Sequence, residues 1–157
     1  MHAGTKAFTL VEIIVVIVVI GILAAVAIPK FVGAQEETAV AAAAEDLKAI
    51  ELAVDMYHAM HNAYPPDVNR TRQVDELTPF FKADNPFAKP CPIGGVYDWE
   101  GPPRWNPPQV AIRKNGSNVY SDADALALDE HFDDGNLSTG RFRRDGSQRL
   151  TFYLGAD

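Results

Sequence analysis

One carboxylate, Glu12, lies inside an apolar run near the start of the chain. The run extends from Phe8 to Ile28 and contains no other charged side chain. A charge at the centre of a bilayer costs about 2.5 to 3.5 kcal/mol on insertion scales. Pairing the carboxylate with an amine would offset part of that cost. An ionisable residue in such a segment indicates a functional contact, and we predict that Glu12 makes one.

A second set of polar side chains lies near the other end of the chain, in the stretch DEHFDDGNLSTGRF. The candidate metal ligands are Asp129, Asp133, Asp134, Asn136 and Ser138. Hard oxygen ligands close together suit calcium, although their spacing does not match an EF-hand loop. Asp and Gly directly after a helix more often form a turn. We therefore expect no cofactor and keep calcium at these five residues as the alternative.

The remaining reactive side chains give little support for catalysis. His58 and His61 are three residues apart, a spacing that could hold a metal only with a third ligand, so we expect exposed or helix-capping histidines. Cys91 is the only cysteine and has no histidine nearby, so we expect a packed thiol. The chain contains no G-x-S-x-G nucleophile elbow and no glycine-rich phosphate loop. We predict that it is not an enzyme.

Length and charge narrow the class of protein further. At 157 residues the chain can form one domain plus an appendage. Its net charge is −7, and it has no lysine and arginine cluster of the kind that binds phosphates. Nucleic acid is therefore not indicated as a partner.

The apolar run has the length of a membrane span. Its 21 residues would cover about 30 Å as a helix, which is the thickness of the hydrocarbon core of a bilayer. A cleaved signal peptide, ending at the small residues 25–27, is one alternative. A simple anchor with Lys6 on the cytoplasmic side is another. Glu12 and a helical pattern that continues past Pro29 argue against the signal peptide, and the simple anchor leaves Glu12 unexplained.

An amphipathic helical pattern follows Pro29 and continues to about His61, where NAYPPD stops it. Its apolar stripe, with spacings of three and four residues, consists of Val40, Ala43, Leu47, Ile50, Val54 and Tyr57. We expect this stripe to pack on a globular domain. The charged residues should face water; these are Glu36, Glu37, Glu45, Asp46, Lys48, Glu51 and Asp55. Leu52, Met56 and Met60 form a flank that we expect to widen the core, with contact to a neighbouring subunit as the alternative.

The sequence of the second half of the chain predicts short strands and short helices. Strands are expected in GGVYDWEG, PQVAIRKN and QRLTFYLG, because each is short and bounded by turn residues. A helical turn is expected near RQVDELTPFF, and a short helix in SDADALALDEHFDDG, capped by Ser121 or Asp122 and closed by Gly135. The aromatic residues of the proline-rich part, 65–108, need burial and so argue against disorder. The fold class is therefore α+β: a long kinked N-terminal helix packed on a small antiparallel sheet with a C-terminal short helix.

The segment AFTLVEIIVVIVVIGILAAVAIPKFVGAQ resembles the N-terminal segment of type IV pilins and of the pseudopilins of type II secretion systems. Members of that family have a short polar leader, a small residue at the cleavage site, Phe-Thr-Leu, a glutamate and a proline that ends the apolar run. Here the leader is residues 1–7, the first mature residue is Phe8, and the proline is Pro29. One departure is Ala7, where the family usually has glycine.

The resemblance implies roles for individual residues. Cleavage between Ala7 and Phe8 frees an amine that is then N-methylated, and Glu12 pairs with the terminus of a neighbouring subunit during assembly. Gly21 and Pro29 are expected to loosen or kink the helix, because proline removes a backbone hydrogen bond and glycine adds backbone freedom. The chain would then divide into the leader, a membrane and assembly half at 8–29, and an amphipathic helix with a periplasmic domain at 30–157.

The resemblance also implies partners and a function. A prepilin peptidase and methyltransferase would process the chain. It would lie in the lipid of the bacterial inner membrane as a single-pass protein. An inner-membrane assembly platform would then draw it into a homopolymer with other pilins or pseudopilins. The end of the long helix, AIELAVDMYHAMHNAYPPD, resembles the major pseudopilins, which favours a type II secretion pseudopilus that supports protein export. The alternatives are a type IV pilus subunit for adhesion or DNA uptake, and a sensor or enzyme domain that uses the same anchor.

Overall fold

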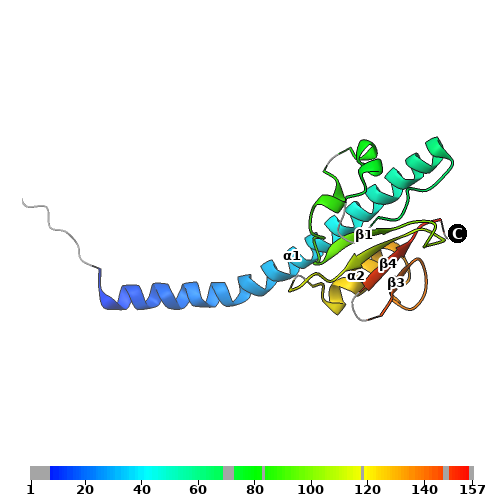
Figure 1. Cartoon of the computed structure of the whole chain (residues 1–157). Coiled ribbons are helices and arrows are strands. Elements are labelled where there is room, and N and C mark those ends of the chain that lie inside the picture. Colours follow the sequence, from blue (N-terminus) through cyan, green and yellow to red (C-terminus); the bar gives the residue numbers. More distant parts are fainter. Residues whose placement is uncertain (1–7, 69–72, 83, 118, 147–148, 156–157) are drawn as a thin grey trace, which may run out of the picture. The chain divides into compact units, whose positions relative to one another are not determined.

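The computed structural model describes residues 8–68, 73–82, 84–117, 119–146 and 149–155. Two compact units share the chain, residues 1–37 and residues 38–157. The elements, in chain order, are α1 (Leu10–His61), the 3₁₀ helices η1 (Asp75–Phe80) and η2 (Pro86–Ala88), β1 (Val96–Glu100), β2 (Gln109–Arg113), α2 (Asp122–Phe132), β3 (Phe142–Arg144) and β4 (Arg149–Tyr153) (Figure 1). The α+β prediction is confirmed, with α2 placed before the last two strands.

Helix α1 has 52 residues and includes Pro29. It ends at His61, as the sequence predicts, and the next residue, Asn62, adopts a left-handed conformation with φ of 51°. Asparagine tolerates this conformation better than most residues, and the prolines that follow cannot continue a helix. The residues of α1 from Thr38 onward belong to the second compact unit.

The four strands form one antiparallel sheet in the order β1-β2-β4-β3. The pairing aligns Trp99 with Val110, Val110 with Phe152, and Phe152 with Phe142, so these large apolar residues share one face. The prediction missed β3, which has only three residues, two of them arginines. Such a short polar segment shows no alternating apolar pattern, and it becomes a strand through its pairing with β4.

The core lies between that face of the sheet and the second-unit part of α1. Ala43, Leu47, Ile50 and Val54 of the predicted stripe are completely buried, and Val40 and Tyr57 pack against them. Helix α2 contributes to the same core, because Phe132 contacts the rings of both Phe142 and Phe152. The stripe therefore packs on a globular domain as predicted.

Two expectations about α1 were wrong. Leu52, Met56 and Met60 do not widen the core, since they are 50%, 43% and 71% exposed. The sheet covers the face of Leu47, and residues spaced from it by five or nine positions point elsewhere on a helix. Asp46 does not simply face water, because its carboxylate accepts a hydrogen bond from the Tyr97 hydroxyl of β1, at 3.2 Å.

The buried stripe predicts a large difference between two leucines of the same helix. Leu47→Ala should lower the free energy of unfolding by about 2 to 5 kcal/mol, because it leaves a cavity in a closed core. Leu52→Ala, at a half-exposed position, should change it by less than about 1 kcal/mol. Denaturant unfolding of the full chain in detergent, followed by the fluorescence of buried Trp99, measures both. Equal effects would contradict the assignment of the core face.

Candidate functional site

The start of α1 is organised by Thr9 and Glu12. The Thr9 backbone amide and hydroxyl both donate to Oε2 of Glu12, each at 2.8 Å. In return the Glu12 amide donates to the Thr9 hydroxyl at 3.2 Å. This reciprocal pattern is a capping box, which satisfies amide groups that the first turn of a helix leaves free. Glu12 is therefore held at the positive end of the helix dipole, and its Oε1 takes no part in the capping box.

The sequence carries a signal for this cap, although the predicted role of Glu12 did not include capping. A threonine followed three residues later by a glutamate, directly before an apolar run, is the pattern of a capping box. Phe8, directly before this cap, is 80% exposed and is not helical. Ala7, on the other side of the predicted cleavage site, lies outside the described residues.

The helix that follows is apolar on all sides and lacks cover within its own unit. Its large apolar side chains from Leu10 to Ile28 are 46–75% exposed. The helix is long and apolar enough to cross a membrane, with a most apolar window of mean hydropathy 3.2, none of it buried. A β-carbon added at Gly21 would meet nothing within 4 Å, so the glycine is not required by a close neighbour. The kink at Gly21 and Pro29 stays a prediction.

The five predicted calcium ligands lie at the end of α2 and in the loop that follows. Asp129 is completely buried, and both its carboxylate oxygens lack a hydrogen-bond partner among the described residues. Burial, followed by the negative charge of Asp133, raises the pKa of Asp129, and the nearby amides of Asn136 and Gly135 only partly oppose this rise. A buried carboxylate without a partner fits a cation site, because a cation would remove both penalties.

The other four candidates bond mainly within the loop. Asp133 Oδ2 accepts the amides of Arg141 and Phe142, and the Gly140 backbone lies so close that a β-carbon there would overlap the carboxylate. The Asp134 oxygens accept from the Asn136 amide at 2.9 Å and the Thr139 hydroxyl at 2.9 Å, and the Asn136 side chain accepts from the Ser138 amide at 3.1 Å. Within the described part of the chain, no three acidic, histidine or cysteine side chains form a metal-binding group. Calcium here would therefore need backbone oxygens or water in addition to Asp129.

The histidines at the end of α1 pack on aromatic rings. The His58 ring stacks on Tyr64 and the His61 ring on Tyr57, with centroids 4.3 and 4.2 Å apart. Nδ1 of His61 also lies 3.0 Å from the backbone oxygen of Tyr57, in the last turn of the helix. These contacts agree with the expected capping role.

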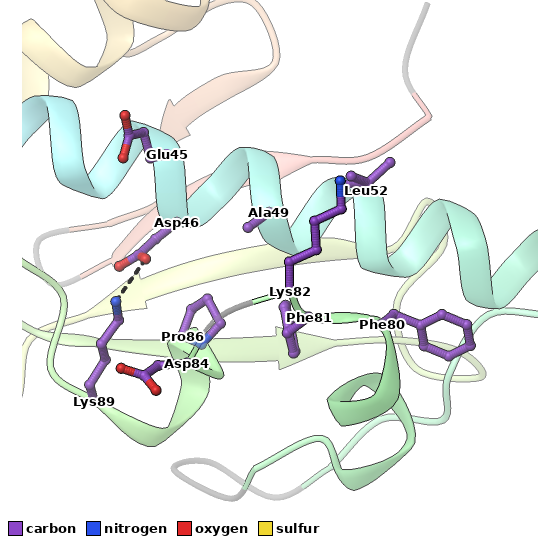
Figure 2. A pocket seen from close by; sticks show the side chains of 10 residues that line it. All are labelled: Glu45, Asp46, Ala49, Leu52, Phe80, Phe81, Lys82, Asp84, Pro86 and Lys89. Atoms are coloured by element: carbon purple, nitrogen blue, oxygen red, sulfur yellow. Dashed lines mark ion pairs between the residues drawn. The ribbon is translucent and has the colours of Figure 1, made fainter.

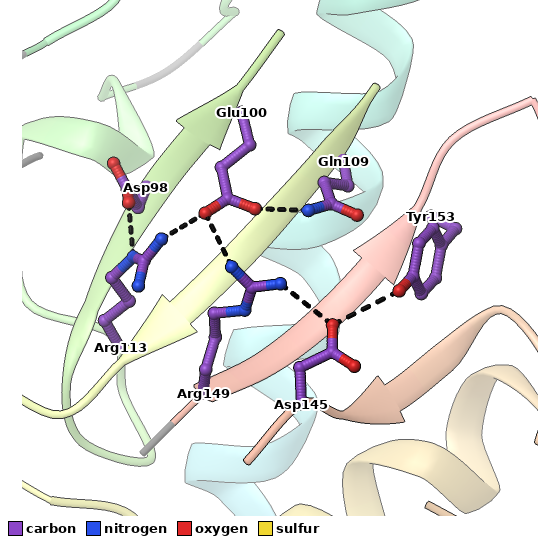
Figure 3. A network of polar contacts seen from close by, with 7 residues as sticks. All are labelled: Asp98, Glu100, Gln109, Arg113, Asp145, Arg149 and Tyr153. Atoms are coloured by element: carbon purple, nitrogen blue, oxygen red, sulfur yellow. Dashed lines mark hydrogen bonds and ion pairs between the residues drawn. The ribbon is translucent and has the colours of Figure 1, made fainter. Parts of the chain in front are cut away.

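A charged network lies on the face of the sheet opposite α1 (Figure 3). Arg113 bridges Asp98 and Glu100, and Arg149 joins Glu100 at 3.0 Å to Asp145 at 2.9 Å. Burial alone would raise the pKa of Asp145, but hydrogen bonds led by that of Arg149 hold the pKa below its usual value. The Arg149 guanidinium also lies 5.1 Å from the ring centroid of Trp105. Because each carboxylate is paired with a cation, we interpret this network as structural.

Comparisons with known proteins agree with the N-terminal pattern. Residues 3–28 match the family model of the prokaryotic N-terminal methylation motif. The chain is similar to type II secretion system core protein G of Pseudomonas aeruginosa, 47% identical over 58 residues, covering 37% of this chain and 41% of that protein. It is also similar to core protein G of Klebsiella pneumoniae, 36% identical over 90 residues, covering 57% and 61%. The similarity spans less than two thirds of each relative.

The fold also has a counterpart among solved structures. The structure of the major type IV pilin PilA1 from Clostridium difficile superposes with a TM-score of 0.54 at 15% identity, covering 76% of this chain and 96% of that one. The structural comparison therefore shows a pilin fold, and the chain matches the model of the N-terminal methylation motif. Within this class its sequence is similar to core protein G of type II secretion systems. The resemblance to pseudopilins and type IV pilins is confirmed.

The position of Cys91 predicts low thiol reactivity. Its side chain is buried, and burial raises the pKa of the thiol to about 11. At pH 8 the native thiol should react with iodoacetamide at least about 100-fold more slowly than an exposed thiol of pKa 9.0, because only the thiolate attacks. Mass spectrometry of the full chain, native and in denaturant, measures the two rates. Fast labelling of the native chain would contradict a packed thiol.

Proposed function

We propose that this chain is a structural subunit of a type II secretion pseudopilus and not an enzyme. It is made as a prepilin, cut between Ala7 and Phe8, and N-methylated on Phe8 by a prepilin peptidase and methyltransferase. Residues 8–29 hold it in the bacterial inner membrane, with residues 30–157 in the periplasm. An assembly platform in that membrane then draws it into a filament that supports protein export.

The observation that carries this proposal is the methylation motif at residues 3–28, together with the apolar run from Phe8 to Ile28, whose large side chains are uncovered and whose one charged residue is Glu12. Processing would place a positive amine on Phe8, next to the Thr9 cap. The Glu12 carboxylate already bonds to Thr9 through Oε2, so Oε1 is the oxygen that would meet the amine of a neighbouring copy. Within a membrane or a filament core such a pair offsets the cost of burying either charge alone.

The choice of a type II secretion pseudopilus over a type IV pilus rests on sequence similarity. The relatives named above are core proteins of type II secretion systems, 47% and 36% identical over 58 and 90 residues. The pilin structure shares the fold at 15% identity, which leaves a type IV pilus subunit as the second candidate. Deleting the gene separates the two: loss of protein export supports a pseudopilus, and loss of surface pili with export intact supports a pilus.

The capping box allows the charge of Glu12 to be tested apart from its helix-capping role. Glutamine can also serve in a capping box, so Glu12→Gln keeps the cap and removes the charge. With a prepilin peptidase present, we expect Glu12→Gln and Glu12→Leu to be cut after Ala7 but to lower filament recovery at least about tenfold, because an amine would lose its charged partner. Intact mass reports the cut, and sedimentation of sheared filaments reports assembly.

Each result of this experiment has a separate meaning. Wild-type recovery with Glu12→Gln would show that Glu12 serves only as a cap and would overturn the proposed charge pairing. Cleavage of the wild type after Ala27 would show a secreted domain, and no cleavage at all would show a simply anchored one.

We also propose calcium binding at the end of α2, with Asp129 as the central ligand. Asp133, Asp134, Asn136 and Ser138 would supply further oxygens directly or after rearrangement of the loop. The cation would neutralise a carboxylate that the protein leaves buried without a partner and would tie the loop to α2. This would stabilise the second unit, since a ligand that binds only the folded state raises the free energy of unfolding.

Calcium should reverse the order of stability of the wild type and the Asp129→Asn variant. In a calcium chelator, Asp129→Asn should be at least as stable as the wild type, because the variant lacks an unpaired buried charge. With calcium at about 100 times its dissociation constant, the wild type should gain about 2.7 kcal/mol and the variant none. Thermal unfolding of both full chains measures the difference. An unchanged wild-type Tm would exclude calcium and leave the loop as a turn.

A further inference from the structure

A groove runs along the exposed side of α1 in the second unit (Figure 2). It has a volume of about 330 Å³. Its α1 wall consists of Glu45, Asp46, Ala49 and Leu52. Its other wall consists of Phe80, Phe81, Lys82, Asp84, Pro86 and Lys89, from η1, the turn after it and η2. Leu52, which lines the groove, is exposed, and so are Met56 and Met60, which follow it at four-residue spacing on the same helix. An apolar surface outside the membrane segment is therefore left uncovered.

The charges of the groove are ordered along α1. Asp46 pairs with Lys89 at 3.0 Å near the N-terminal end, where Glu45 and Asp84 add two more negative charges (Figure 2). Lys82 and Leu52 line the other end of the groove, and in Figure 2 the Lys82 side chain extends toward that part of α1. The groove is therefore acidic at its N-terminal end and basic farther along.

A second uncovered apolar surface of this chain carries charges in an order that complements the charges of the groove. It lies directly after the apolar run, where Phe31 is 70% exposed. On a helix, Lys30, Ala34 and Glu37 follow one another along one face, with Phe31 beside them. Lys30 and Glu37 are seven residues apart, which is also the separation of Glu45 and Leu52 on α1.

We propose that residues 30–37 of a second copy of this chain dock in the groove, parallel to α1. Lys30 of that copy would then meet Glu45 and Asp84, its Ala34 would face Ala49, and its Glu37 would meet Lys82. Phe31 would cover the apolar part of the groove. An antiparallel helix would place like charges together at both ends, which is unfavourable.

The parallel direction rests on the proposed function, because copies anchored in one membrane by the same end must run the same way. Each copy carries both the segment and the groove. A contact between two different surfaces of identical chains can repeat from copy to copy and build an open helical filament. The groove thus gives such a filament a second specific contact besides Glu12.

Disulfide trapping between two single-substitution chains tests this register. Copies anchored at one depth in a membrane hold residues 34 and 49 about 22 Å apart along the helix axis, so this contact needs the axial stagger of a filament. Full-length Ala34→Cys and Ala49→Cys, coexpressed and oxidised in sheared filaments or after solubilisation in detergent, should form a mixed disulfide dimer. Ala34→Cys with Ala123→Cys is the matched control, because Ala123 is also an exposed helical alanine but lies on α2. Buried Cys91 stays in all chains. Non-reducing electrophoresis measures the dimer.

Charge reversal tests the same contact. Lys30→Glu in the Ala34→Cys chain should lower the yield of mixed dimer at least about fivefold, because a charge pair becomes a repulsion. Glu45→Lys in the Ala49→Cys chain should restore it. A general effect on folding or insertion would not be rescued by a second reversal in a different chain.

Two separate readouts keep this proposal distinguishable from the function. One is the recovery of wild-type filaments, and the other is the mixed dimer, measured in filaments or in detergent, where the chains are free to shift along their axes. Wild-type filaments without the mixed dimer would overturn the docking site and leave the proposed function intact. A mixed dimer without filaments would support the docking site and count against the pseudopilus. A dimer equally abundant in the Ala123→Cys control would show random collision and would also overturn the docking site.

Discussion

The apolar half of α1 sets the main constraint on this molecule, because nothing in its own compact unit covers it. The large apolar side chains from Leu10 to Ile28 remain about half exposed or more. Each large apolar side chain left in water loses about 1.5 to 3 kcal/mol relative to burial. The segment must therefore lie in lipid or among other apolar helices. The helix cap, the position of the single charge and the proposed filament all follow from that need.

The same helix meets a different environment in the second unit. There its buried apolar residues lie on one face of the helix, and the sheet covers Leu47, Ile50 and Val54 of that face. The opposite face of the sheet is closed by paired charges in place of a second apolar layer. Asp98 and Glu100 are buried, yet each has an arginine partner. The buried core of the second unit thus consists of residues of that unit.

The sequence predicted the elements whose patterns are local. The long helix, its buried stripe, three strands and the Ser121 cap all have signals within a few residues. It did not predict β3, which depends on pairing with β4, or the buried network, which depends on residues brought together by the sheet. The exposure of Leu52 and Met56 was also mispredicted, since helical spacing defines a face but not what covers it. Asp129 was predicted as a candidate calcium ligand within a short helix, but its complete burial depends on the packing of α2 and could not be read from the sequence.

The position of the Thr9 cap has a consequence for proteolysis. Proteases bind extended chain and cut helical segments slowly, because a helix must first unwind locally. The capping box starts α1 at Leu10 and leaves Phe8 and Thr9 outside the helix. The proposed scissile bond therefore adjoins non-helical backbone even though a 52-residue helix begins two residues later. The cap thus serves as a boundary between the part of the chain that a peptidase can engage and the part that must stay intact.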